Sequence, residues 1–336
     1  MSLTVLSQKN IDDILSKDNV EVANAIVDLM GETFAKFTAG HSDDTKALQA
    51  QSPQRIGIDT DSRKVLFMPS RLGETTSIKI VSVPTKDGLS GLPATVMVMD
   101  EDTGRVQAVM NADSLTAIRT AAGSGLATRY YADENAKNLL VFGAGAQGEA
   151  HVKIMLAVRP NLEKIYIWNR SEARKQGLIK ELQKAHPTRE FIAVKADNSN
   201  LEEIVRNADI ICTCTNSTEP VLFGKWLKPG VHLNCIGSYR MDMHEIDSET
   251  VKKAELIIVD SIDACKHEAG ELVKSSKPEQ WIEMGSRVLD GLKKTEAERN
   301  KRTLFKSVGI SVQDSAIAGW ILDRAKRSNI GSKVPF

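Results

Sequence analysis

Neither charge sign is in excess in this sequence. Its 336 residues include 44 lysines and arginines and 44 aspartates and glutamates, so the formal net charge is zero. Proteins that hold a polyanion or an anionic membrane surface usually carry an excess of basic residues. We therefore expect neither nucleic acid nor a membrane among the partners of this protein.

Cysteine is scarce, and its positions follow no ligand or disulfide pattern. No C-x-x-C pair occurs, and no histidines stand at zinc-finger intervals. We therefore predict no metal site and expect buried thiols of a reducing compartment. The four residues are Cys212, Cys214, Cys235 and Cys265.

Long apolar runs are also missing. No stretch approaches the length that spans a bilayer, and Lys9, Asp12 and Asp13 interrupt the apolar residues of the N-terminal segment. A secretory signal needs an unbroken apolar region. These observations predict a cytoplasmic protein.

From Asn138 onward, the sequence alternates short β-branched runs with amphipathic stretches. This alternation is typical of a parallel sheet covered by helices on both faces, and the chain is long enough for two domains. We predict an α/β fold with a doubly wound, six-stranded parallel sheet of the Rossmann type. The expected strands are 139–142, 164–168, 190–194, 209–214, 232–236 and 255–259, with helices over 148–158, 171–186 and 201–207.

The first 130 residues alternate less cleanly and indicate an α+β domain. The expected elements are a helix over 22–37, strands near 64–68, 77–83 and 94–100, and a helix from Asp113 to about Tyr131. The six strands of the expected sheet are already assigned to earlier segments. No strand partner is therefore expected for the apolar segment 304–312 or for the final helix 313–327. We therefore predict one domain from 1–130 and 305–336, and a Rossmann domain over 131–304.

The most specific motif is the glycine-rich turn GAGAQG. It places Gly143, Gly145 and Gly148 in G-x-G-x-x-G spacing, directly after a predicted strand and before a predicted helix. The first glycine permits a tight turn, the second lets a pyrophosphate approach the backbone, and the third lets the helix pack near the strand. A glycine-rich turn alone is often only a turn, but this context predicts a dinucleotide site.

The end of the second strand indicates which dinucleotide is bound. NAD-binding folds usually carry an acidic residue here that accepts hydrogen bonds from the ribose, whereas Asn169, Arg170 and Ser171 follow Trp168 in this sequence. Arg170 can pair with a 2′-phosphate, and Asn169 and Ser171 can add donors. We expect NADP(H) to be favoured, with NAD(H) possible. A solvated loop arginine is the alternative interpretation.

Three cations of the first domain suggest a pocket for an anion. Lys79 shares its strand face with Val81 and Val83, and Arg119 lies on the apolar stripe of its helix. Arg55, in an expected loop, is the third. Buried cations need partners, and together these residues favour a substrate carboxylate. Taken singly, each can instead be a salt-bridged surface residue.

Two further segments leave alternatives open. The small residues 121–125 predict close packing, either by a neighbouring element or by a nicotinamide ring. Glu268 follows the sixth strand and would lie near the strand ends where ligands bind. It is a candidate for substrate contact, and a solvated acidic loop is the alternative.

The sequence closely resembles the ornithine cyclodeaminase/mu-crystallin family over nearly its whole length. The matching segments are 68–70, Lys79, 103–104 with 108–110, 116–122, the GAGAQG turn, 167–170, 218–224, and 305–309 with Asp314. The resemblance implies homodimers and a substrate and dimerisation domain completed by the C-terminal helix.

The resemblance also implies roles for individual residues. Arg55, Lys79 and Arg119 match substrate-carboxylate contacts, and Lys79 also matches a lysine credited with catalysis in the amino-acid dehydrogenases of the family. Lys79 and Arg119 are therefore the catalytic candidates. The cofactor-binding candidates are Arg119, Thr120, Gly143, Gly145, Ala146, Gln147, Asn169, Arg170, Ser171, Thr215, Ile236 and Val308.

One departure from the family pattern affects the expected reaction. Ornithine cyclodeaminases carry an aspartate two residues after the glycine that follows the fifth strand, whereas Tyr239 stands there in this chain, and Asp242 comes three residues later. A phenol, with a pKa of about 10, cannot replace a carboxylate base at neutral pH.

We therefore expect NADPH-dependent reduction of a ketimine or imino acid that bears a carboxylate, and the reverse direction, as an amino-acid dehydrogenase, stays open. The alternatives are conversion of ornithine to proline, and an NADPH-gated binding protein without catalysis.

Overall fold

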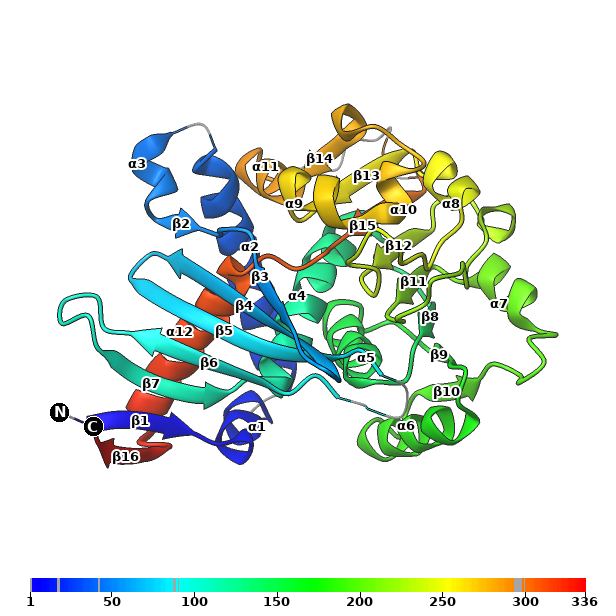
Figure 1. Cartoon of the computed structure of the whole chain (residues 1–336). Helices are drawn as coiled ribbons and strands as arrows, with labels where there is room; N and C mark the ends of the chain where they lie inside the picture. The colour runs from blue at the N-terminus through cyan, green and yellow to red at the C-terminus, as the bar shows by residue number, and fades with distance from the viewer. Residues whose placement is uncertain are drawn as a thin grey trace. The chain divides into compact units, whose positions relative to one another are not determined.

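The chain forms two compact units in the computed structural model, which describes residues 2–16, 19–41, 43–86, 89, 91–292, 298 and 300–336. The first unit consists of Met1–Arg119 and Ile310–Phe336, and the second unit of Thr120–Gly309 (Figure 1). The two-part first unit has the chain order expected from the sequence. Its boundaries, however, lie at 119/120 and 309/310 rather than at 130/131 and 304/305.

Within the described residues, no helix combines the length and the apolar character that crossing a membrane requires. The same part of the chain holds no group of three or more His, Cys, Asp or Glu side chains suited to a metal ion.

The first unit contains a mixed sheet of eight described strands. They follow the order β16-β1-β7-β6-β5-β4-β2, and β3 also pairs with β4. Only the β1–β7 pair is parallel in the described residues. The strands are β1 (Ser2–Leu6), β2 (Ala50–Gln51), β3 (Ile56–Asp59), β4 (Arg63–Leu72), β5 (Thr75–Pro84), β6 (Ala94–Met99), β7 (Val106–Asn111) and β16 (Ser332–Pro335).

Helix α12 (Val312–Ser328) packs against one face of this sheet across β4, β5 and β6, and α2 (Asn19–Ala39) packs against α12. Figure 1 shows α12 crossing behind the strands. Because side chains alternate along a strand, Ser70, Ser77 and Lys79 lie on one face of the sheet, where they contact Ser315 and Asp314 of this helix. The shorter helices α1 (Gln8–Ser16) and α3 (Asp44–Ala47) complete the unit.

The second unit is a fully parallel sheet of eight described strands in the order β10-β9-β8-β11-β12-β15-β13-β14. The order reverses beside β8, as in doubly wound dinucleotide folds. The strands are β8 (Asn138–Phe142), β9 (Lys164–Trp168), β10 (Glu190–Ala193), β11 (Ile210–Thr213), β12 (His232–Cys235), β13 (Leu256–Val259), β14 (Trp281–Glu283) and β15 (Thr303–Lys306). The α/β fold class and the Rossmann-type sheet predicted from the sequence are therefore confirmed.

The helices of the second unit connect these parallel strands. Three of them match the predicted ones: α5 (Ala146–Val158), α6 (Glu172–Ala185) and α7 (Leu201–Asn207). The others are α8 (Ser248–Lys253), α9 (Ile262–Glu268), α10 (Gly270–Val273), α11 (Met284–Leu289) and the 3₁₀ turns η1 (Gly224–Trp226) and η2 (Pro278–Gln280).

The expectation that the apolar tail segment lacks a strand partner was wrong. Residues Thr303–Lys306 form β15, which inserts between β12 and β13. All four residues are buried, as expected of a central parallel strand covered on both faces. The sequence pattern of such a strand is a short apolar run that does not reveal its neighbours. The sequence therefore predicts six strands, whereas the described part of the sheet contains eight.

Helix α4 (Asp113–Tyr131) has the predicted span and is anchored at its C-terminal end. The guanidinium of Arg159 donates hydrogen bonds to the carbonyl oxygens of Thr128, Arg129 and Ala132 at this end of the helix. The hydroxyl of Ser124 lies 2.9 Å from Nε2 of His151 on α5. Of the two alternatives for the small residues, a neighbouring element therefore lies beside Ser124.

Candidate active site

A buried cluster of charged side chains lies in the first unit. Lys79 Nζ is 2.7 Å from Asp314 Oδ2, and Arg119 Nε donates to Asp314 Oδ1 at 2.9 Å. The three side chains come from β5, α4 and α12, and none is more than 5% exposed. Lys79 and Arg119, predicted separately from the sequence, thus share one carboxylate. They are salt-bridged, as the alternative interpretation held, but they are buried rather than on the surface.

The local sequence explains how each side chain reaches this cluster. Lys79 stands opposite Met68 on β4 and Val96 on β6, so it occupies a core position on the sheet face that α12 covers. Arg119 follows the buried stripe of α4, and Asp314 lies in the first turn of α12. Burial makes an unpaired cation costly, which explains why an aspartate stands between the two.

Electrostatics shift the pKa of Lys79 from 10.5 to about 7. Burial is the main cause; Asp314 raises the pKa again, and the positive charges of Arg119 and Arg55 lower it. Burial alone would raise the pKa of Asp314, but Arg119 and Lys79 hold it below its ordinary value. The cluster therefore contains a lysine that can gain or lose a proton near neutral pH.

Two residues extend this cluster. Gln313 Oε1 accepts a hydrogen bond from Arg119 Nη1 at 2.9 Å and from the backbone N–H of Ile310 at 3.3 Å. Arg55, just before β3, is half-buried, and its charge contributes to the lowered pKa of Lys79.

Asp314 was quoted from the sequence only as part of the family resemblance and received no role. The signal available was an acidic residue among apolar neighbours early in the final helix.

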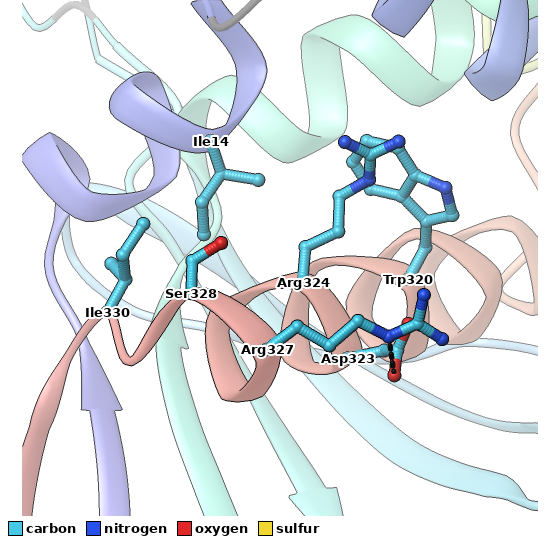
Figure 2. A pocket seen from close by; sticks show the side chains of 7 residues that line it. All are labelled: Ile14, Trp320, Asp323, Arg324, Arg327, Ser328 and Ile330. Atoms are coloured by element: carbon cyan, nitrogen blue, oxygen red, sulfur yellow. Dashed lines mark hydrogen bonds and ion pairs between the residues drawn. The ribbon is translucent and has the colours of Figure 1, made fainter.

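A separate concavity of the first unit, about 340 Å³ in volume, lies at the C-terminal end of α12 (Figure 2). There the Arg324 guanidinium lies 4.0 Å from the centre of the Trp320 ring, and Arg327 pairs with Asp323. None of the site residues predicted from the sequence lines this concavity. Its lining residues are Ile14, Trp320, Asp323, Arg324, Arg327, Ser328 and Ile330.

The glycine turn of the second unit has the geometry that its motif predicts. Gly143 has a φ of +113°, and a Cβ there would lie 2.6 Å from the carbonyl oxygen of Cys214. A Cβ on Gly148 would lie 2.0 Å from the carbonyl oxygen of Gly143. Gly145 and Ala146, where α5 begins, are exposed. Exposed backbone N–H groups at a helix N-terminus can bind an anion.

The end of β9 is joined to this turn. Asn169 Oδ1 accepts the backbone N–H of Ala144 at 3.1 Å, and its amide nitrogen donates to the carbonyl oxygen of Ser171. Ser171 caps α6 by accepting the N–H of Arg174. Arg170 is exposed. The geometry thus gives Asn169 a structural role in the turn and leaves Arg170 accessible to a ligand.

Two predicted cofactor residues donate hydrogen bonds to buried carboxylates, and a third is itself buried. Thr215, after β11, donates its backbone N–H and its hydroxyl to Glu245. Val308, after β15, donates its N–H to Asp260 at 3.0 Å. Ile236, after β12, is 7% exposed. Neither Glu245 nor Asp260 was singled out from the sequence, because an acidic residue in the segment that follows a strand resembles any solvated loop position.

The segment after β13 differs from the expected loop. Residues Ile262–Glu268 form helix α9, and the half-buried Glu268 is its last residue. The buried carboxylate of this segment is Glu271, 1% exposed, which pairs with Lys306 at 2.7 Å. Tyr239 packs against the core of the second unit, and Asp242 pairs with Arg240 at the surface.

Comparison with known proteins identifies related chains. The sequence profile of the ornithine cyclodeaminase/mu-crystallin family matches residues 11–329. A Delta(1)-pyrroline-2-carboxylate reductase of Bacillus cereus is 34% identical over 287 residues, which cover 82% of this chain and 86% of the relative. The ketimine reductase mu-crystallin of Macropus fuliginosus is 35% identical over 232 residues, 68% of each chain.

A solved structure shares the fold over the whole chain. The Thermococcus litoralis Delta(1)-pyrroline-2-carboxylate reductase, in complex with NADH and L-proline, has a TM-score of 0.87 and 28% identity. The match covers 99% of this chain and 100% of the other. This protein therefore belongs to the ornithine cyclodeaminase/mu-crystallin family, as its sequence indicated.

Proposed function

We propose that this protein reduces an imino acid, a C=N compound bearing a carboxylate, with a nicotinamide dinucleotide as the reductant. The observation that carries the proposal is the buried cluster in which Lys79 and Arg119 share Asp314. Relatives named as pyrroline-2-carboxylate and ketimine reductases support the same reaction.

The cluster suits a carboxylate because its charges are unequal. Lys79 and Arg119 face one aspartate, and Arg55 adds further positive charge at longer range. A substrate carboxylate would neutralise this excess, and charge-assisted hydrogen bonds to Arg119 would fix its orientation. Holding the substrate in one orientation is itself a large part of catalysis in such reactions.

Lys79 is suited to handle the proton of the reaction. Reduction adds a hydride to the imine carbon and a proton to the imine nitrogen, and a bound reduced nicotinamide supplies the hydride. The Lys79 ammonium would donate the proton and be protonated again from water. With a pKa of about 7, it can act as an acid near neutral pH. A substrate carboxylate beside it would stabilise its protonated form.

The second unit fits the pyrophosphate and the 2′-phosphate of NADPH. The turn from Gly143 to Gly148 has no room for a Cβ at either end, and its exposed N–H groups suit a pyrophosphate. Arg170 and the Ser171 hydroxyl would hold the 2′-phosphate. The nearest acidic residue in sequence, Glu172, pairs with Lys175 at 2.7 Å. This arrangement supports a preference for NADP(H), with NAD(H) also usable.

The test is NADPH oxidation by wild type and Lys79→Ala, with Δ1-pyrroline-2-carboxylate and related cyclic imino acids. We expect turnover by wild type and at least a 100-fold lower kcat/KM for the variant, as for loss of a general acid. Unchanged turnover in the variant would remove Lys79 from the chemistry. Proline formed from ornithine with catalytic NAD would favour cyclodeamination instead. Ligand binding that requires NADPH, without oxidation of any imine, would favour a binding protein.

We also propose that the protein is a homodimer joined through the open face of the first sheet. This face, opposite the Lys79 row, carries the partly exposed apolar row Val5, Pro69, Ile78, Met97 and Val109. Light scattering after size exclusion should report a dimer for wild type and a monomer for Met97→Lys. The control Leu48→Lys, at an already exposed position, should stay dimeric, and a monomeric wild type would overturn the proposal.

A further inference from the structure

Glu245 is a fully buried carboxylate of the second unit that accepts five hydrogen bonds. Its Oε1 accepts the backbone N–H and the hydroxyl of Thr215, at 2.5 and 2.8 Å. Its Oε2 accepts the Thr213 hydroxyl at 2.8 Å and the backbone N–H groups of Gly237 and Ser238 at 2.7 and 3.2 Å. One side chain therefore joins the segments that follow two different strands.

These segments follow neighbouring parallel strands, β11 and β12. They approach each other so closely that a Cβ on Gly237 would lie 1.9 Å from the carbonyl oxygen of Thr215. Ligands of doubly wound folds bind outside the carboxyl ends of the strands. In dinucleotide folds of this type the second nucleotide binds over the half of the sheet on the other side of the reversal. Here the glycine turn follows β8, and that other half begins with β11 and β12.

A third strand is linked to the backbone of Glu245 through the carboxylate of Glu271. Glu271 Oε2 accepts the backbone N–H of Glu245 at 2.9 Å, and its Oε1 lies 2.7 Å from Lys306 Nζ at the end of β15. Lys306 also donates to the carbonyl oxygen of Ser238 at 2.5 Å. Burial and Glu271 raise the pKa of Glu245, whereas Lys306 and Thr215 act in the opposite direction. The network thus fixes three adjacent strand ends from inside the protein.

We propose that Glu245 is a positioning residue for the nicotinamide half of the bound dinucleotide. It holds Thr215 and Gly237 in the arrangement that this half contacts, while the glycine turn holds the pyrophosphate independently. The inference rests on the proposed function. A glutamine cannot replace Glu245, because either orientation of its amide would direct an NH₂ group at a backbone N–H, that of Thr215 or that of Gly237.

The experiment compares two ligands by isothermal titration: NADPH, and 2′-phospho-ADP-ribose, which lacks the nicotinamide. For Glu245→Gln we expect about tenfold weaker binding of NADPH, the effect of leaving a buried donor without its acceptor, and unchanged binding of the fragment. Thr213→Val removes one of the five hydrogen bonds and should weaken NADPH binding about threefold. Glu283→Gln changes another buried carboxylate of this unit, bonded to Ile262, and should alter neither affinity.

The two ligands separate positioning from general damage to the fold. Equal loss of both affinities in Glu245→Gln, or no loss of either, would overturn the inference. If Glu245→Gln does not fold, Thr213→Val provides the test. An NADPH affinity of Thr213→Val equal to that of wild type would also contradict the inference. Failure of wild type to bind NADPH or NADH would count against the proposed cofactor and not against the role of Glu245.

Discussion

Each unit buries a cluster of charged side chains. The excess charge is positive in the first unit and negative in the second, and different kinds of partner compensate it. In the first unit, Lys79 and Arg119 share Asp314. In the second unit, Lys306 pairs with Glu271, whereas the carboxylate of Glu245 is surrounded by hydroxyl and backbone N–H donors. In the described part of the chain, the Lys79 ammonium has three donors but one carboxylate acceptor, Asp314.

We interpret this difference as the one between a structural network and the binding site that we propose. Neutral donors of the protein already stabilise the surplus carboxylate of the second unit. The surplus cation of the first unit has no equivalent set of acceptors among the described contacts, so it suits an external anion. The following substitutions test this contrast.

The largest effect is expected for Asp314→Asn. It leaves two buried cations without their carboxylate, and breaking a buried ion pair from one side costs about 3–5 kcal/mol. Chemical denaturation should show this loss, and Asp323→Asn, an exposed position on the same helix, should stay close to wild type. If the first unit needs its aspartate for charge balance, adding Lys79→Met to Asp314→Asn should recover part of the stability. No recovery would contradict the charge argument.

The next largest effect is expected in the glycine turn of the second unit, where backbone N–H groups would bind the pyrophosphate. Gly148→Ala places a methyl group 2.0 Å from a backbone oxygen, so the turn must shift, and we expect roughly 100-fold weaker NADPH binding, the upper range for loss of oriented donors. Gly177→Ala on α6, where a Cβ meets nothing within 4 Å, should keep full affinity and gain up to about 1 kcal/mol of stability. Titration calorimetry and thermal unfolding measure both, and tight NADPH binding by Gly148→Ala would contradict the assigned site.

Arg170→Ala tests whether a single exposed side chain of this unit selects the cofactor. The loss of a charge-assisted hydrogen bond should weaken NADPH binding about 10- to 100-fold and leave NADH binding nearly unchanged. Arg206→Ala on α7, which removes an arginine paired with Glu202, is the matched control. Equal effects on both cofactors would remove the 2′-phosphate contact from the proposal.

The smallest effect is the pH dependence of the first unit. Burial lowers the pKa of Lys79 to about 7, and the proton transfer that we propose for Lys79 needs its protonated form. The kcat/KM should therefore fall about tenfold per pH unit above 7. Lys79→Arg stays charged in this pH range. Its kcat/KM should therefore be much lower than that of wild type and should not decline above pH 7. A pH profile that is flat from 7 to 9 in wild type would contradict the role of Lys79.

The lowered pKa of Lys79 also determines whether its contribution to the free energy of unfolding rises or falls with pH. Between pH 7 and 10.5 the unfolded chain binds the Lys79 proton and the folded chain does not, so the contribution of Lys79 to stability rises with pH in this range. Below pH 7 both states are protonated, and this contribution is constant. Denaturation curves of wild type and Lys79→Met measured across this range should diverge in that direction.

The sequence by itself determined the parts of this protein that depend on local rules. The glycine spacing, the alternation of strands and helices, and the span of α4 from Asp113 to Tyr131 are set by backbone conformation and short-range periodicity. It also indicated Lys79 and Arg119, because a cation on an apolar stripe contradicts its surroundings.

Only the tertiary structure decided what those cations meet. Asp314 lies 195 residues from Arg119 along the chain, and β15 enters the sheet from a segment that seemed to have no partner. The five donors around Glu245 likewise come from the ends of two strands. Contacts of this kind depend on which strands and helices become neighbours, and neighbouring side chains far apart in sequence leave no periodic signal in a single chain.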